Sequence, residues 1–259
     1  MSQENIISSF NEFKRSYGSE TVVFYVEIDE TWDDDYQVSN AKTALANQLL
    51  QRFISCLYLG TTDQSSLVFK QNEYGKPYLV GSDFSFSMSN QQGYTSMVIN
   101  PNGKEIGIDL ASCKDVEKFE QDYLNHFQNI FHENEFKLLE EHTNKDELKL
   151  IFTTYWALKE SYTKYLGIGL NSDLSSYNFQ NVELLPENSN PVQMDDPMII
   201  RHNINWSNST KLEITNEPQK ENIWLTKVTP DIVVSIIGYI PRQPRLIKIP
   251  LKSITNYFS

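Results

Sequence analysis

Hydrophobic positions recur at helical spacing over three stretches of this chain. Between residues 146 and 166 no proline interrupts the pattern, which predicts a long, largely buried helix that ends before Gly167. A second helix is predicted over residues 41–57, with Asn40 as a candidate N-cap, and a third over residues 116–142. The apolar positions of the longest helix are Leu148, Ile151, Phe152, Tyr155, Trp156, Leu158, Tyr162 and Leu166.

Runs of β-branched and aromatic residues predict strands on both sides of these helices. The first strands are expected at 21–28, 66–69 and 94–99, and the last of these pairs in a hairpin with 106–110 around Asn102-Gly103. Beyond Gly169, proline-separated runs predict strands at 174–179, 198–201, 211–214, 223–228, 232–240 and 246–249. This order indicates an α+β fold with two α/β halves, residues 1–104 and 105–259.

The longest predicted helix carries the first candidate chemistry. Trp156, Glu160 and Lys164 are four residues apart, so their side chains share one side of the helix. Taken alone, Glu160 and Lys164 are typical of a solvated surface pair that contributes about 0.3–0.5 kcal/mol. Because the flanking positions are aromatic and aliphatic, we expect the pair to lie in a cleft instead.

Two shorter segments add to this pattern. Gly107-Ile108-Asp109 ends a β-branched strand in an acidic side chain, which is a common way to present a metal-binding carboxylate at a sheet edge. Gly75-Lys76-Pro77 has the residues of a fixed turn. Each segment alone is weak evidence for a function. Their order and spacing before the helix make a more specific sequence pattern.

With these three segments in this order, the chain resembles the larger, surfactin-type 4′-phosphopantetheinyl transferases. The resemblance extends over about residues 42–179 and is nearest to the fungal enzymes that activate α-aminoadipate reductase in lysine biosynthesis. It implies two similar halves related by a pseudo-twofold axis, with the active site between them. It also implies transfer of phosphopantetheine from coenzyme A to a serine of the apo carrier domain of that reductase, with release of adenosine 3′,5′-bisphosphate.

The resemblance assigns roles to residues of this chain. Asp109 and Glu160 are expected to bind Mg²⁺, which prefers oxygen ligands, and Glu160 is also expected to deprotonate the acceptor serine directly or through a water. Lys164 would stabilise charge on the departing phosphate. The residues expected to contact coenzyme A are Lys42, Lys76, Ser87, Ser89, Lys159 and Lys164.

The evidence for these coenzyme A contacts differs from one residue to another. Lys76 matches the lysine of the family's G-K-P loop, which holds the adenosine bisphosphate end. Lys42 lies near the start of its predicted helix, a position that suits a phosphate, but a solvated lysine is an equal alternative. Lys159 could face either the phosphates or the carrier.

Three positions depart from the family pattern. Ser85 stands for an asparagine, Met88 for a histidine that contacts a phosphate, and Ala111 for a third acid. A thioether carries no charge, so Ser87, Ser89 or a lysine would have to supply that phosphate contact. These departures leave two alternatives open. One is an inactive relative that binds coenzyme A or the carrier, and the other is a broad-range transferase for fatty acid or polyketide carriers.

Composition bounds the remaining possibilities. The chain has 259 residues, of which 39% are hydrophobic and 22% charged, as in an ordinary globular protein. A net charge of −12 argues against nucleic acid as a partner and requires a locally positive cleft for any phosphate. With only two cysteines, no signal peptide pattern and no apolar run long enough for a membrane helix, we expect a cytoplasmic protein. We also expect a monomer, although none of these features determines the oligomeric state.

Overall fold

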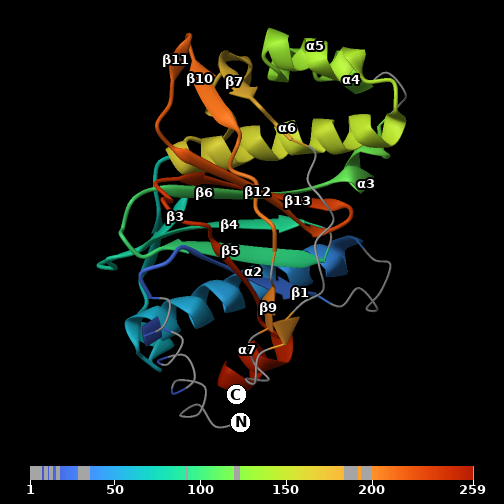
Figure 1. The fold of residues 1–259 in the computed structure, drawn as a ribbon. Helices are drawn as coiled ribbons and strands as arrows, with labels where there is room; N and C mark the ends of the chain where they lie inside the picture. Colours follow the sequence, from blue (N-terminus) through green and yellow to red (C-terminus); the bar gives the residue numbers. More distant parts are fainter. Residues whose placement is uncertain are drawn as a thin grey trace.

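The computed structural model describes residues 18–28, 36–91, 93–119, 123–183, 192–193, 200–202 and 204–258, together with Ser8, Asn11, Lys14 and Arg15. The two main sheets lie next to each other, with helices on either side (Figure 1), so the predicted α+β class is confirmed. Among the helices in these ranges, none combines the length and the apolar composition that crossing a membrane would require.

The larger sheet has six strands in the order β4-β5-β1-β14-β9-β8. Strand β1 lies inside the sheet, where it pairs antiparallel with β5 and parallel with β14. The sheet therefore joins the start of the chain to its last strand. Its strands are β1 (Val22–Glu27), β4 (Ser85–Gln91), β5 (Tyr94–Asn100), β8 (Val192–Gln193), β9 (Ile200–His202) and β14 (Arg245–Lys248).

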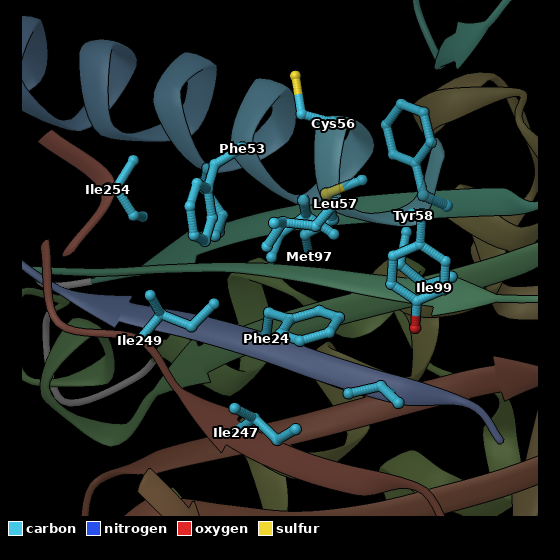
Figure 2. Packing of buried hydrophobic residues seen from close by; sticks show 14 of the residues in the cluster. Phe24, Phe53, Cys56, Leu57, Tyr58, Met97, Ile99, Ile247, Ile249 and Ile254 are labelled. Carbon is cyan, nitrogen blue, oxygen red and sulfur yellow. The ribbon is translucent and has the colours of Figure 1, made fainter. Parts of the chain in front are cut away.

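One face of the six-stranded sheet is covered by α2 (Tyr36–Leu59), with α7 (Leu251–Phe258) packed beside it. Figure 2 shows the side chains that fill the space between these elements, with Phe53 of α2 and Ile254 of α7 above Phe24 and Ile247 of the sheet. These four side chains are at most 2% exposed. Burial of so much apolar surface holds α2 and α7 against the sheet.

The smaller sheet, in the order β12-β13-β6, carries the long helix α6 (Lys145–Leu166) on one face (Figure 1). Asn144 caps the start of this helix by accepting from the backbone N–H groups of Asp146 and Glu147. Gly167 ends it in the left-handed conformation, with φ 71°. The strands are β6 (Ile106–Ser112), β12 (Asn222–Thr229) and β13 (Ile232–Gly238).

Shorter elements surround these two layers. A three-stranded sheet in the order β11-β10-β7 lies beyond α6, and β2 pairs with β3 next to the larger sheet. The helices are α3 (Cys113–Val116), α4 (Tyr123–His126) and α5 (Glu133–Glu141). The strands are β2 (Phe69–Gln71), β3 (Pro77–Leu79), β7 (Tyr177–Gln180), β10 (Lys211–Ile214) and β11 (Glu217–Pro218).

The two main sheets meet where β4 lies beside β6, and serine side chains make the junction. The backbone N–H of Ile108 donates to Ser87 Oγ at 3.3 Å, and that of Leu110 donates to Ser89 Oγ at 3.1 Å. In an ordinary sheet, the carbonyl oxygens of the neighbouring strand would accept these hydrogen bonds. Here the serine hydroxyls accept them, so these buried N–H groups of β6 have partners although β4 and β6 form no backbone hydrogen-bond ladder. Ser87 and Ser89 therefore have a structural role at the junction.

Several sequence predictions differ from this fold. Strands 94–99 and 106–110 form, but not as a hairpin, because β5 pairs with β4 and β1 whereas β6 pairs with β13. The helix predicted over 116–142 is broken into short helices, since His132 and Glu135 form a capping box that starts α5 afresh. Of the predicted strand 198–201, the first two residues lie outside the described residues.

The predicted start of the first long helix and the predicted boundary between the two halves also differ from the structure. Helix α2 begins at Tyr36, so Asn40 is not its N-cap and Lys42 lies about two turns into the helix instead of in its first turn. The proposed division at residues 104 and 105 does not coincide with the division into sheets. Strand β14 and helix α7, from the end of the chain, complete the sheet and core of the first half.

Candidate active site

A cleft of about 610 Å³ lies between β4 and β6 on one side and α6 on the other. Trp156, Glu160 and Lys164 line it from α6, as their spacing predicts, and Asp109 lines it from β6. The structure therefore brings together the three residues to which we assigned chemical roles. The lining is completed by Met88, Ser89, Asn90, Gln91, Leu110, Ala111, Ser112, Asp115, Val116, Lys118, Phe119, Phe127, Phe152 and Thr153.

Strand β6 and helix α6 approach each other closely because of Gly107. A Cβ atom at this position would lie 2.0 Å from the carbonyl oxygen of Ser161 and 2.4 Å from the backbone nitrogen of Tyr165. Only glycine allows this approach. Since Asp109 lies two residues along the same strand, the contact brings its carboxylate to the helix.

The acidic residue of β6 and the lysine of α6 form a direct ion pair. Lys164 Nζ lies 2.7 Å from Asp109 Oδ1, and both also contact Ser89 Oγ, each at 3.0 Å. The Asp109 side chain is 7% exposed, whereas that of Lys164 is 29% exposed. The lysine therefore neutralises a buried acid and still offers N–H donors to the cleft.

The pair expected between Glu160 and Lys164 is replaced by this contact of Lys164 with Asp109. Burial raises the pKa of Glu160 above its ordinary value, the nearby charge of Asp109 raises it further, and Lys164 opposes the shift. Burial also raises the pKa of Asp109, against the effects of Lys164 and Ser89. Two carboxylates thus share a cleft in which the charge of Asp109 disfavours ionisation of Glu160.

This arrangement fits a divalent cation. A cation near Asp109 and Glu160 would relieve their repulsion, and carboxylate oxygens are the ligands that Mg²⁺ prefers. Across the described part of the chain no cluster of three or more acidic, histidine or cysteine side chains could hold a metal. The remaining coordination positions would therefore be open to waters, main-chain oxygens or phosphate oxygens. Ala111 lines the cleft with a methyl group at the position of the family's third acid.

The coenzyme A residues expected from the sequence do not all reach this cleft. Ser89 and Lys164 line it, whereas Ser87 serves the strand junction. Lys76 lines a separate pocket of about 310 Å³ at the end of α6, with Pro77 and Gly167. Its ammonium is bonded to Glu105 and to the carbonyl oxygens of Ile106 and Tyr165.

Two other lysines lie outside both pockets. Lys42 is half-buried on α2 and is not among the residues that line either space. Lys159 is 0% exposed and pairs with Glu135, so the expectation that it faces the phosphates or the carrier does not hold. A residue next to Glu160 on a helix points about 100° away from it, which directs Lys159 into the core.

Sequence reasoning missed the apolar end of the cleft. Phe119, Phe127 and Phe152 line it beside Trp156, and the rings of Phe127 and Trp156 meet edge to face at 5.8 Å. At its rim Lys118 pairs with Asp115, which also accepts from Gln91 of β4. The high density of aromatic residues between 119 and 131 could have indicated this apolar side of the cleft, but we interpreted these residues as the buried face of one helix.

The fold and cleft thus define an α+β protein that presents two carboxylates and a lysine where two sheets meet. Comparisons with known proteins extend this description. Residues 105–225 match the model of the 4′-phosphopantetheinyl transferase superfamily. The chain belongs to this superfamily, as the sequence resemblance predicted.

The most similar relatives include two yeast proteins, each named L-aminoadipate-semialdehyde dehydrogenase-phosphopantetheinyl transferase. The one from Candida glabrata is 40% identical over 138 residues, which cover 52% of each chain. The one from Saccharomyces cerevisiae is 33% identical over 201 residues, which cover 70% of this chain and 71% of the relative. The 4′-phosphopantetheinyl transferase gsp of Aneurinibacillus migulanus is 29% identical over 140 residues, or 54% of each chain.

Proposed function

We propose that this protein transfers 4′-phosphopantetheine from coenzyme A to a serine of an apo carrier domain. The observation that supports this most is the meeting of Asp109, Glu160 and Lys164 in one cleft within a chain of this superfamily. Attack of a serine hydroxyl on the pyrophosphate of coenzyme A needs a base, charge neutralisation and a stabilised leaving group. The cleft offers a residue for each of these needs.

Glu160 is the candidate base. It lies in the cleft with a raised pKa, so its carboxylate accepts a proton more readily than an ordinary glutamate does. It takes the proton of the serine hydroxyl directly or through a water as the oxygen bonds to the β-phosphorus. Lys164 donates hydrogen bonds to the departing α-phosphate of adenosine 3′,5′-bisphosphate, which the exposure of its ammonium allows.

Asp109 and Glu160 are the residues that would hold Mg²⁺. When bound, the ion neutralises the pyrophosphate and polarises its phosphorus–oxygen bonds. Asp109 also orients Lys164 through their 2.7 Å contact, and Ser89 orients both. Lys76 and its pocket at the end of α6 offer a place for the adenosine end, and Lys42, which lines neither space, is a further candidate for the phosphates.

The acceptor that we propose is the carrier domain of α-aminoadipate reductase. Support comes from the names of the two yeast relatives, and the carrier preference is otherwise open. Because the match covers about half of the Candida glabrata protein, its activity is transferred to this chain only as a proposal. We expect the protein to work as a cytoplasmic monomer.

The test is incubation of this protein with coenzyme A, Mg²⁺ and three apo carriers, from α-aminoadipate reductase, fatty acid synthase and a polyketide synthase. Conversion of the first carrier only, lost in EDTA and restored by Mg²⁺, supports the specific function. Comparable conversion of all three indicates a broad-range transferase. Binding of coenzyme A without conversion of any carrier would show an inactive relative.

A further inference from the structure

A buried ion pair lies directly behind the cleft. Lys159 Nζ is 2.6 Å from Glu135 Oε2, and both side chains are 0% exposed. Lys159 is the residue before Glu160 on α6, and Glu135 lies on α5. The pair therefore connects the helix that carries the candidate base to a second helix outside the cleft.

Every hydrogen-bonding group of this pair has a partner. Lys159 Nζ donates to the carbonyl oxygens of Tyr177 at 2.6 Å and Leu174 at 2.9 Å, in addition to Glu135. These three acceptors match the three protons of an ammonium. The buried charge therefore fixes α6 to the start of β7 as well as to α5.

Glu135 continues the network on its other side. Its Oε1 accepts from the backbone N–H of Phe179 at 2.7 Å, and its Oε2 accepts from that of His132 at 3.0 Å. Each of these contacts has a defined direction, so the network resists both sliding and rotation of α6. An apolar pair of the same volume would not supply such directional restraint.

Energy alone does not explain this pair. Desolvation of two charges offsets most of their attraction, and apolar replacements of buried ion pairs are often neutral or stabilising. What the network does provide is a fixed rotation of α6 at the turn that carries Glu160. Side chains at successive helical positions differ by about 100°, so fixing Lys159 into the core also fixes Glu160 toward the cleft.

We propose that Lys159 and Glu135 are positioning residues for transfer, holding α6 so that Glu160 stays beside Asp109 in the cleft. This inference rests on the proposed function, and it gives the lysine before Glu160 a role other than binding coenzyme A. A displacement of about 1 Å at a reacting group can reduce a rate about 100-fold. Loosening the pair should therefore lower kcat without removing any group that touches substrate.

The test compares Glu135→Gln with Leu50→Ala, a cavity variant in the core of the other half, where Leu50 is 0% exposed. The amide that replaces the carboxylate of Glu135 cannot satisfy both sides, because its NH₂ group must face another donor, either the N–H of Phe179 or the ammonium of Lys159. Below the Tm of each variant, we expect kcat of Glu135→Gln to fall at least tenfold, with KM for coenzyme A within twofold of wild type. Leu50→Ala should keep wild-type kcat at a similar loss of Tm.

Amide hydrogen exchange of residues 156–164 gives a second readout that does not depend on turnover. We expect it to be at least tenfold faster in Glu135→Gln than in Leu50→Ala, and Lys159→Met to show a larger effect of the same kind. Wild-type kcat and unchanged exchange in Glu135→Gln would overturn the positioning role. Absence of transfer by the wild type would instead refute the proposed function, and exchange would still decide whether the pair fixes α6.

Discussion

Substitution of Gly107 by alanine should displace Glu160 and Lys164 without changing either side chain. It therefore tests whether the position of these residues matters for transfer. The new Cβ atom would lie 2.0 Å from the carbonyl oxygen of Ser161 and 2.4 Å from the nitrogen of Tyr165. An ordinary contact needs at least 3.4 Å, so backbone atoms must separate by about 1.4 Å. Both contacts are with the main chain of α6, which cannot yield as a flexible side chain would.

The consequences follow from which residues are pushed. Ser161 directly follows Glu160, and Tyr165 directly follows Lys164, so the clash displaces the helix at both site residues. Overpacking of this kind costs about 1–3 kcal/mol of folding free energy. A displacement of about 1 Å at the reacting groups lowers a rate about 100-fold, so kcat should fall by roughly that factor while the protein remains folded.

Ile108→Val provides the matched control on the same strand. Ile108 is 0% exposed in the core on the side of β6 away from α6, and its truncation costs about 0.5–1.5 kcal/mol without pushing the helix. Urea unfolding gives the stability of each variant, and carrier conversion at saturating substrates gives kcat. If Gly107→Ala retained the kcat and stability of the wild type, the close approach of β6 and α6 would not set the geometry of the site.

Two further substitutions test the carboxylates. Glu160→Gln should abolish transfer. In metal-free buffer its Tm should be higher than that of the wild type, and this difference should grow as the pH rises from 4 to 8. The reason is that a carboxyl group whose pKa is raised by folding destabilises the protein once it ionises, above its ordinary pKa of 4.5. A Tm difference that shrinks over this range would contradict that sign. Asp109→Ala should lower kcat and raise the Mg²⁺ concentration required for half-maximal rate, and a variant with lower kcat but unchanged Mg²⁺ dependence would argue against Asp109 as a ligand.

The parts of the site that follow from local periodicity could be predicted from the sequence. Asn144 and Gly167 bound α6 closely to the predicted range of 146–166, because capping is decided within one turn of the chain. The spacing of Trp156, Glu160 and Lys164 then places all three in one cleft, since a regular helix repeats every 3.6 residues.

Features that depend on pairing between distant segments could not be predicted in the same way. The Asn102-Gly103 turn suggested a hairpin, but the partner of β6 is β13, more than 100 residues later in the chain. Lys159 carries a charge that suggested a side chain facing the phosphates or the carrier. Only the position of Glu135 and two carbonyl groups in the folded chain makes its burial possible.

The charge partner of Lys164 shows the same limit within the site itself. Sequence spacing favoured Glu160, four residues earlier on the helix, whereas Asp109 of β6 makes the contact. The close approach at Gly107 decides between them, because it brings the strand within reach of the lysine. Helical spacing thus predicted that Glu160 and Lys164 share one cleft, the family resemblance added Asp109, and tertiary packing decided how they pair.

The central claim is tested most directly by the intact mass of an apo carrier domain of α-aminoadipate reductase after incubation with this protein, coenzyme A and Mg²⁺. We predict a gain of one phosphopantetheinyl group, absent with Glu160→Gln and absent from a carrier whose acceptor serine is replaced by alanine. An unchanged carrier mass with the wild-type protein, or an equal gain with Glu160→Gln, would contradict the account.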